Sequence, residues 1–162
     1  MTDLTYSQLL DTVRATHGAY HKLTILVGPS GAGKTHLLNR VANDLQIPAI
    51  NLSLLLSQGL LSYTRRQRAL KAEELATQII DDHFQSGLCI DNTELLFDST
   101  LKTNPLVFLQ EISRNRFIVA TWNGICTGGE LRYGQNGHPD HFSQPASGYP
   151  VISVTEEKLQ LA

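Results

Sequence analysis

Residues 28–35 constrain the fold more than any other part of the sequence. They read Gly-Pro-Ser-Gly-Ala-Gly-Lys-Thr and match the pattern G-x-x-x-x-G-K-[ST]. Residues 23–27 before them form a nearly continuous apolar run, as in a parallel strand that is buried on both faces. After them, apolar residues recur at helical spacing until Pro48 ends the pattern; these are Leu37, Leu38, Val41 and Leu45. The sequence therefore predicts a strand, a glycine loop and a helix in direct succession.

This arrangement is the phosphate-binding P-loop. Glycines let successive backbone N–H groups surround phosphate oxygens, and the N-terminus of the following helix adds partial positive charge. Lys34 can reach the β- and γ-phosphates and contribute to catalysis, and the Thr35 hydroxyl can ligate Mg²⁺. A chance glycine turn between a strand and a helix is the alternative. We predict a site for ATP and Mg²⁺ whose nucleotide-binding residues are Gly28, Pro29, Ser30, Gly31, Ala32, Gly33, Lys34, Thr35 and His36.

Further apolar runs alternate with helical patterns along the chain. Strands are expected at 49–52, 88–91, 117–121 and 151–154, and helices at 5–17, 73–84 and 105–114. Residues 53–61 are ambiguous, and residues 124–149 are rich in Gly, Pro, His and Ser. The alternation predicts an α/β protein with about five mostly parallel strands in three layers. With 162 residues, we expect one domain spanning 1–162.

Composition excludes several broad classes of protein. The net charge of −2 indicates no general electrostatic grip on nucleic acid, so any DNA contact would have to be local. The one basic cluster, Arg65-Arg66-Gln67-Arg68 with Lys71, is either a solvated helix start or a phosphate contact. Two cysteines, Cys89 and Cys126, form no paired framework, and no apolar stretch is long enough to span a bilayer. We therefore expect a cytoplasmic protein with reduced thiols and no membrane association.

A second motif supplies a carboxylate. Asp91 ends the apolar run 88–91, the position from which an aspartate holds the magnesium site in the Walker B role. Capping of the following turn is the alternative role. P-loop ATPases of the AAA+ type place a glutamate directly after this aspartate, where this chain has Asn92. Glu94 either turns toward the γ-phosphate as a catalytic residue or lies on a surface turn. The sequence thus supports nucleotide binding more firmly than hydrolysis.

Other candidate residues lie further along the chain. Thr121-Trp122-Asn123 resembles the sensor-1 element of AAA+ ATPases, in which Asn123 or Thr121 would orient water or contact the γ-phosphate. A turn asparagine is the alternative, and Trp122 is interpreted as packing. Candidate arginine fingers, which would come from a neighbouring subunit, are Arg114, Arg116 and Arg132, with an ordinary surface role as the alternative. The run His-Pro-Asp-His at 138–141 could imitate a metal cluster, but its loop context argues against one.

Taken together, these motifs resemble BrxF, a family of small P-loop proteins of BREX (bacteriophage exclusion) defence systems. The resemblance spans nearly the whole chain, and its landmarks are residues 28–35, 47–53, 88–92, 121–124 and 137–139. It implies a bacterial, cytoplasmic ATP-binding component that acts beside a larger ATPase and a methyltransferase. Compared with full AAA+ proteins, the sequence stops soon after the fifth expected strand, so we expect an AAA+-like core without a C-terminal helical lid. Any homo-oligomer would then have to assemble through the core.

The leading hypothesis is an ATP-binding protein, acting as a slow ATPase, that changes its assembly or its partner contacts with the γ-phosphate. A small-molecule kinase is one alternative, although no arginine-rich lid or phosphoacceptor pocket is evident in the sequence. A non-hydrolysing, nucleotide-dependent scaffold on DNA or partner proteins is another. Residues 91–94 lack the glycine of the D-x-x-G switch and no N-K-x-D motif occurs, so adenine is expected as the base.

Overall fold

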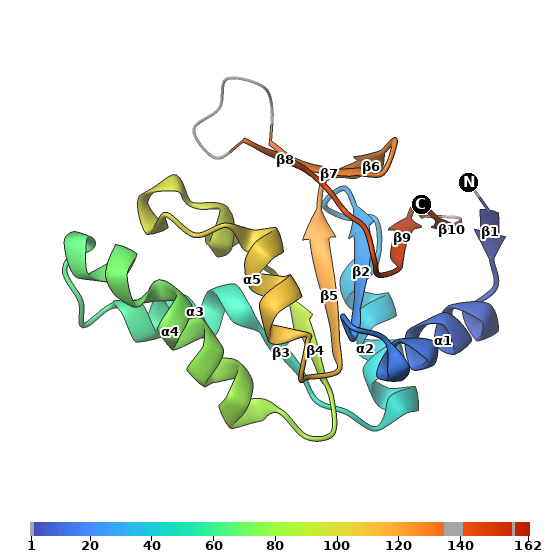
Figure 1. Cartoon of the computed structure of the whole chain (residues 1–162), viewed down its shortest axis with the longest axis horizontal. Coiled ribbons are helices and arrows are strands. Elements are labelled where there is room, and N and C mark those ends of the chain that lie inside the picture. Colours follow the sequence, from blue (N-terminus) through green and yellow to red (C-terminus); the bar gives the residue numbers. More distant parts are fainter. Residues whose placement is uncertain (1, 135–140, 157) are drawn as a thin grey trace.

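The structure is a computed structural model, and it describes residues 2–134, 141–156 and 158–162. A seven-stranded sheet runs through its centre in the order β1-β10-β9-β2-β5-β4-β3 (Figure 1). The five strands from β9 to β3 are parallel, and β10 and β1 extend one edge in antiparallel pairing. Their bounds are β1 Thr2–Leu4, β2 Leu23–Gly28, β3 Ala49–Asn51, β4 Leu88–Asp91, β5 Ile118–Asn123, β9 Val151–Val154 and β10 Leu159–Leu161.

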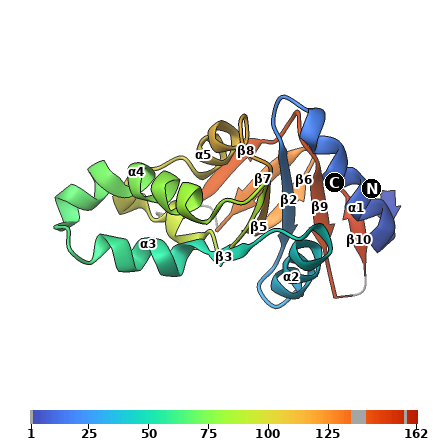
Figure 2. The ribbon, with the colours of Figure 1, turned by 90° about the horizontal axis from the view of Figure 1, so that it is seen from below.

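Helices cover both faces of this sheet, which gives three layers (Figure 2). Alternate side chains of each central strand enter two separate apolar clusters, because successive residues of a strand point to opposite faces. In β2, for example, Ile25 belongs to one cluster and Leu26 to the other. One cluster contains α1 (Tyr6–Ala15) and α2 (Lys34–Leu45); the other contains α3 (Leu52–Leu60), α4 (Arg65–His83) and α5 (Pro105–Ile112). The predicted mixed α/β class with a mainly parallel sheet is confirmed.

Several predicted boundaries differ from the structure, and in two cases a helix cap explains the difference. The strand predicted at 49–52 ends one residue earlier, because Asn51 accepts a hydrogen bond from Leu54 N and caps α3, which also resolves the ambiguous segment 53–61. The helix predicted at 73–84 begins eight residues earlier, at Arg65. Its cap is Thr64, which exchanges hydrogen bonds with Gln67 in a capping box.

The basic cluster lies in the first two turns of α4. Arg68 Nε donates to the carbonyls of Leu60 and Tyr63, each at 3.0 Å, and so connects α4 to the last residue of α3 and to the turn between the two helices. Lys71 pairs with Glu74 at 3.4 Å. Two of the four basic side chains, Arg68 and Lys71, therefore have partners within the chain, which favours the interpretation of the cluster as the start of a helix.

A small antiparallel sheet, absent from the sequence prediction, lies above the carboxyl ends of the parallel strands (Figure 1). It comprises β6 (Ile125–Thr127), β7 (Glu130–Tyr133) and β8 (Phe142–Pro145). Trp122 joins it to the core: its Nε1 donates to Arg132 O at 3.1 Å, and its ring meets Phe97 edge to face at 4.7 Å. Trp122 is fully buried, so its predicted packing role is confirmed.

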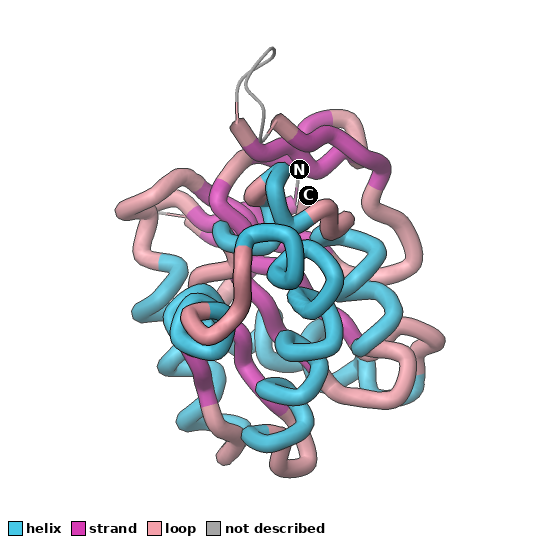
Figure 3. The backbone as a smooth tube through the Cα atoms, turned by 90° about the vertical axis from the view of Figure 1, so that its left-hand side faces the viewer, coloured by secondary structure: helices cyan, strands magenta, loops and turns pink. Residues whose placement is uncertain are grey.

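The His-Pro-Asp-His run at 138–141 falls mostly outside the described residues, and no group of three or more metal-ligating side chains occurs among those that are described. After β9, the described part of the chain contains one short strand, β10. Figure 3 shows the strands of the small sheet in magenta at the top of the view, above most of the helices. Among the residues that the structure describes, no helix is both long and apolar enough to cross a membrane. Cys89 and Cys126 are both buried free thiols, and burial raises the pKa of Cys89 to about 12.

At Gly28 of β2, the backbone of the neighbouring strand β9 comes close. A Cβ atom at this position would lie 2.4 Å from Val154 O, a backbone atom that cannot rotate away. We predict that Gly28→Ala lowers the free energy of unfolding by about 1–3 kcal/mol, as overpacking does elsewhere. Urea denaturation measures this, with Gly59→Ala in α3 as the control because no atom lies within 4 Å of the added methyl group. Equal stabilities for the two variants would contradict the prediction.

Candidate functional site

The carboxyl ends of the parallel strands open into a cleft of about 810 Å³. Strand pairing explains which residues meet there. Gly28 of β2 is in register with Asn123 of β5, and Asn51 of β3 is in register with Asp91 of β4. The cleft is lined by Ser30, Gly31, Gly33, Lys34, Thr35, His36, Asn39, Asn51, Asp91, Asn92, Glu94 and Asn123. Most of the predicted site residues, which come from three separate segments (30–36, 91–94 and 123), therefore surround one space.

The glycine loop connects β2 directly to α2, as the sequence predicts. Gly31 and Gly33 have φ values of 83° and 94°, which side-chain-bearing residues rarely adopt, and Gly33 is the N-cap of α2. Thr35 and His36 are exposed on the first turn of the helix. Pro29 and Ala32 do not line the main cleft; they face a smaller cavity on the other side of the loop, with Thr155 and Glu156. The open end of α2 thus presents backbone N–H groups to the cleft.

Lys34 is folded back over its own loop. Its ammonium donates to the carbonyls of Gly28 and Pro29, both at 2.8 Å, and the residue is only 6% exposed. Burial lowers the pKa of Lys34, whereas the nearby Glu94 and Asp91 carboxylates act in the opposite direction. One cation and two anions therefore share the floor of the cleft.

Thr121 holds the Asp91 carboxylate in place. Its hydroxyl donates to Asp91 Oδ1 at 2.8 Å, and Asn92 N donates to the same oxygen at 2.9 Å. The Thr121 carbonyl in turn accepts from the Thr93 hydroxyl at 2.9 Å. Thr121 is buried, so of the two sensor-1 candidates it is Asn123 that faces the cleft. These bonds use Oδ1 and leave Oδ2 without a hydrogen bond to the described part of the chain.

Glu94 lies in the cleft rather than on an outer surface turn. It begins a 3₁₀ helix, η2 (Glu94–Phe97), and its Oε1 accepts a short hydrogen bond from Asn123 Nδ2. Its Oε2 is buried, and among the described residues it has no hydrogen-bond partner. A buried carboxylate oxygen without a partner is costly, which indicates a place for a water, a cation or a ligand group.

The backbone turns sharply between Asp91 and Glu94. Asn92 has a left-handed φ of 55°, a conformation that asparagine adopts more readily than most residues. Its carbonyl accepts from Ser53 N at 2.9 Å and from the Ser53 hydroxyl at 2.5 Å. The same hydroxyl accepts from Leu95 N at 3.0 Å. This turn aims the carboxylate of residue 94 at Asn123, while Asn92 lines the cleft beside it.

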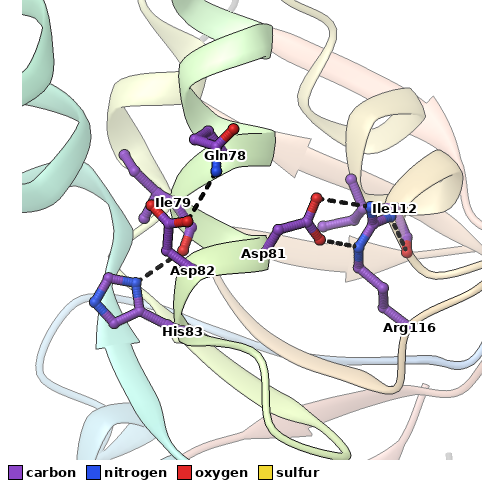
Figure 4. A network of polar contacts seen from close by, with 7 residues as sticks. All are labelled: Gln78, Ile79, Asp81, Asp82, His83, Ile112 and Arg116. Carbon is purple, nitrogen blue, oxygen red and sulfur yellow. Dashed lines mark hydrogen bonds and ion pairs between the residues drawn. The ribbon is translucent and has the colours of Figure 1, made fainter.

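The candidate arginine fingers do not enter this chain's own cleft. Arg116 precedes β5 at the opposite end of the strands, where its Nε donates to Asp81 Oδ1 at 2.6 Å and its Nη2 donates to Asp81 Oδ2 at 3.1 Å (Figure 4). Arg114 covers the ring of Tyr20 at 4.8 Å. Arg132, on β7, lies 3.5 Å from Glu130. Within the chain these contacts are structural, and a role toward a neighbouring subunit stays a prediction.

Sequence reasoning missed three polar residues of the site: Asn39, Asn51 and Ser53. Asn39 follows Thr35 by four residues, so the helical period itself places both on one face of α2. Asn51 and Ser53 follow a short apolar run, which is the same signal that identified Asp91. That signal was weak here because the strand is only three residues long.

Fold and cleft together define a mixed α/β protein with a polar, glycine-rich site at the carboxyl edge of a mainly parallel sheet. Its sequence matches no protein-family model and no curated protein. Similar solved structures include C. elegans PCH-2, with 22% identity, a TM-score of 0.41, and coverage of 73% of this chain and 36% of that chain. A structure described as the basis for katanin self-assembly shares 19% identity, with a TM-score of 0.37 and coverage of 75% and 49%. The chain spans less than half of the length of either protein.

The Thr121 hydroxyl should contribute measurably to stability, because hydrogen bonds to charged groups are stronger than average. We predict that Thr121→Val lowers the free energy of unfolding by about 1–2 kcal/mol. Thr24→Val is a matched control: Thr24 is equally buried in the neighbouring strand β2, but its hydroxyl has no partner among the described residues. Thr24→Val should be neutral or stabilising in the same urea titration. Similar losses in both variants would show that the Asp91 bond contributes nothing.

Proposed function

We propose that the protein binds ATP with Mg²⁺ in this cleft and hydrolyses it slowly. The observation that carries the proposal is the convergence of Lys34, Asp91 and Glu94 on the exposed end of α2. Oriented N–H groups, a helix N-terminus and a lysine together favour a polyanion such as a triphosphate. Volume also agrees, because about 810 Å³ is within the usual range for a small-molecule site.

The donor set also fits a magnesium ion. Mg²⁺ prefers oxygen ligands and is usually held by one or two carboxylates or hydroxyls, together with waters and substrate phosphates. Thr35 and Asp91 would hold it, and the unpartnered Glu94 Oε2 provides a further buried anionic oxygen nearby. Bound there, the ion would neutralise charge on the phosphate oxygens.

Glu94 is the best candidate for the general base. As a base it would accept a proton from the attacking water while Asn123 holds its other oxygen in position. The water oxygen would bond to the γ-phosphorus as the bond to the β–γ bridging oxygen breaks, which leaves ADP and phosphate. Asn92 occupies the position directly after Asp91 but has no acid–base function, so this role passes to residue 94. Two of the three N–H donors of Lys34 are used by loop carbonyls, so contacts to both the β- and γ-phosphates would require at least one of these bonds to break, which is consistent with slow turnover.

The sequence resemblance to BrxF supports a role in BREX defence, beside a larger ATPase and a methyltransferase. In that role the γ-phosphate would control assembly, either of the chain with itself or with those partners. Mass in solution, measured with a non-hydrolysable ATP analogue, with ADP and without nucleotide, tests this. Identical masses in the three states, with and without the candidate partners, would contradict nucleotide control of assembly.

Lys34→Ala should weaken ATP binding at least tenfold, because the cleft then loses the one lysine among its described lining residues. Isothermal titration with ATP and Mg²⁺ measures the change. Lys22→Ala is a matched control, because the Lys22 ammonium also donates to two backbone carbonyls, at 3.2 and 3.1 Å, but at the other end of the sheet. Undiminished binding in Lys34→Ala would overturn the proposed site.

Glu94→Gln should lower the rate of phosphate release about 100-fold and leave ATP affinity nearly unchanged, because loss of a general base affects the chemical step. Glu111→Gln, on the exposed face of α5, controls for the loss of one carboxylate. If Glu94→Gln hydrolyses ATP at the wild-type rate, Glu94 is not the base.

A further inference from the structure

We infer that Ser53 is a positioning residue that holds Asn92 in its left-handed conformation and thereby places the Glu94 carboxylate against Asn123. The inference rests on the proposed function, because Glu94 is proposed there as the general base. It adds a residue outside the phosphate-binding loop and the Asp91 strand, contributed by the first turn of α3.

The first step of the argument is the number of contacts that Ser53 makes with one short segment. Its backbone N–H and its hydroxyl both donate to Asn92 O, and its hydroxyl oxygen accepts from Leu95 N. The hydroxyl therefore bridges the residues before and after Thr93 and Glu94. A bridge of this kind fixes the separation of its two ends and so limits the conformations of the residues between them.

The second step concerns strain. A left-handed φ is unfavourable for residues other than glycine, and asparagine reduces the cost without removing it. Such a conformation persists when the surrounding hydrogen bonds determine it. At Asn92 those bonds come from Ser53 on the carbonyl side, and from Asp91 and Thr121 on the N–H side. Of these, Ser53 is the one residue that also contacts the chain beyond Glu94.

The third step is the effect on Glu94. Its carboxylate makes one hydrogen bond, to Asn123, and its other oxygen is buried without a described partner. These contacts alone do not fix the position of the Glu94 carboxylate. Its position therefore also depends on the direction in which the side chain leaves the backbone. If Asn92 relaxed to an ordinary negative φ, residues 93–95 would rotate and the Asn123 bond would be lost.

The test compares Ser53→Ala with Ser57→Ala. Ser57 lies one turn later in the same helix and donates only to Leu54 O, at 2.8 Å, so it controls for loss of a helix hydroxyl. We expect Ser53→Ala to lower kcat about tenfold with KM for ATP changed less than twofold. Ser57→Ala should leave both constants unchanged. A general loss of folding would instead lower the active fraction and the melting temperature together.

Asn92→Gly provides the second part of the test. Glycine adopts the left-handed conformation without help, so Ser53→Ala should lower kcat no more than about twofold in the Asn92→Gly background. Equal tenfold losses in both backgrounds would overturn the inference, because Ser53 would then act by another route. An unchanged kcat in Ser53→Ala would overturn it directly.

A measurement that needs no turnover is the NMR spectrum of the nucleotide-free protein. Ser53→Ala should shift the backbone resonances of residues 92–95 and the side-chain amide of Asn123, and Ser57→Ala should not. If those resonances stay in place, the inference is wrong even when ATP binding and hydrolysis are as proposed. If they shift but wild-type protein binds ATP without releasing phosphate, the positioning role stands and the proposed hydrolysis fails.

Discussion

Hydrogen bonding of β5 to both β2 and β4 determines what the cleft contains. Because β5 lies between the glycine-loop strand and the Asp91 strand, its carboxyl end separates the phosphate-binding backbone from the acidic residues by one strand width. Thr121 can then hold Asp91 from the side, and Asn123 can reach Glu94 across the cleft. Pairing of β2 directly with β4 would place Asp91 beside the loop and leave no room for this second row of polar side chains.

The acidic segment 91–95 is held from two sides. Thr121 anchors its beginning from β5, and Ser53 anchors its end from α3. Lys34 interacts with the same segment electrostatically: burial lowers the pKa of its ammonium, and the Glu94 and Asp91 carboxylates oppose part of that effect. The Lys34 ammonium thus already has partners within the protein, and an arriving polyanion would replace some of them instead of filling an empty positive site.

Much of this could be read from the sequence, for identifiable reasons. Residues 23–27 are apolar at nearly every position because β2 is buried on both faces. Pro48 correctly signals that α2 ends before it, but the helix already stops at Leu45, where Gln46 adopts a left-handed φ of 56° and caps it. The start of α4 was missed because residues 65–71 carry few apolar side chains, although Thr64 and Gln67 encode the capping box. The order of strands, the pairing of Arg116 with Asp81 and the small sheet at 125–145 depend on contacts between distant residues, which no local pattern specifies. The left-handed Asn92 is an intermediate case: its residue type permits the turn, but Ser53, 39 positions earlier, maintains it.

The position of Trp122 has an optical consequence. It is the chain's only tryptophan, it is fully buried, and it directly precedes Asn123 in the cleft. Its indole N–H is bonded to β7, so the same ring is attached to the main sheet through its backbone and to the small sheet through its side chain. Intrinsic fluorescence excited at the indole band therefore originates from a single place, the junction between these two sheets. Any movement of one sheet against the other would change that emission without a label or a substitution.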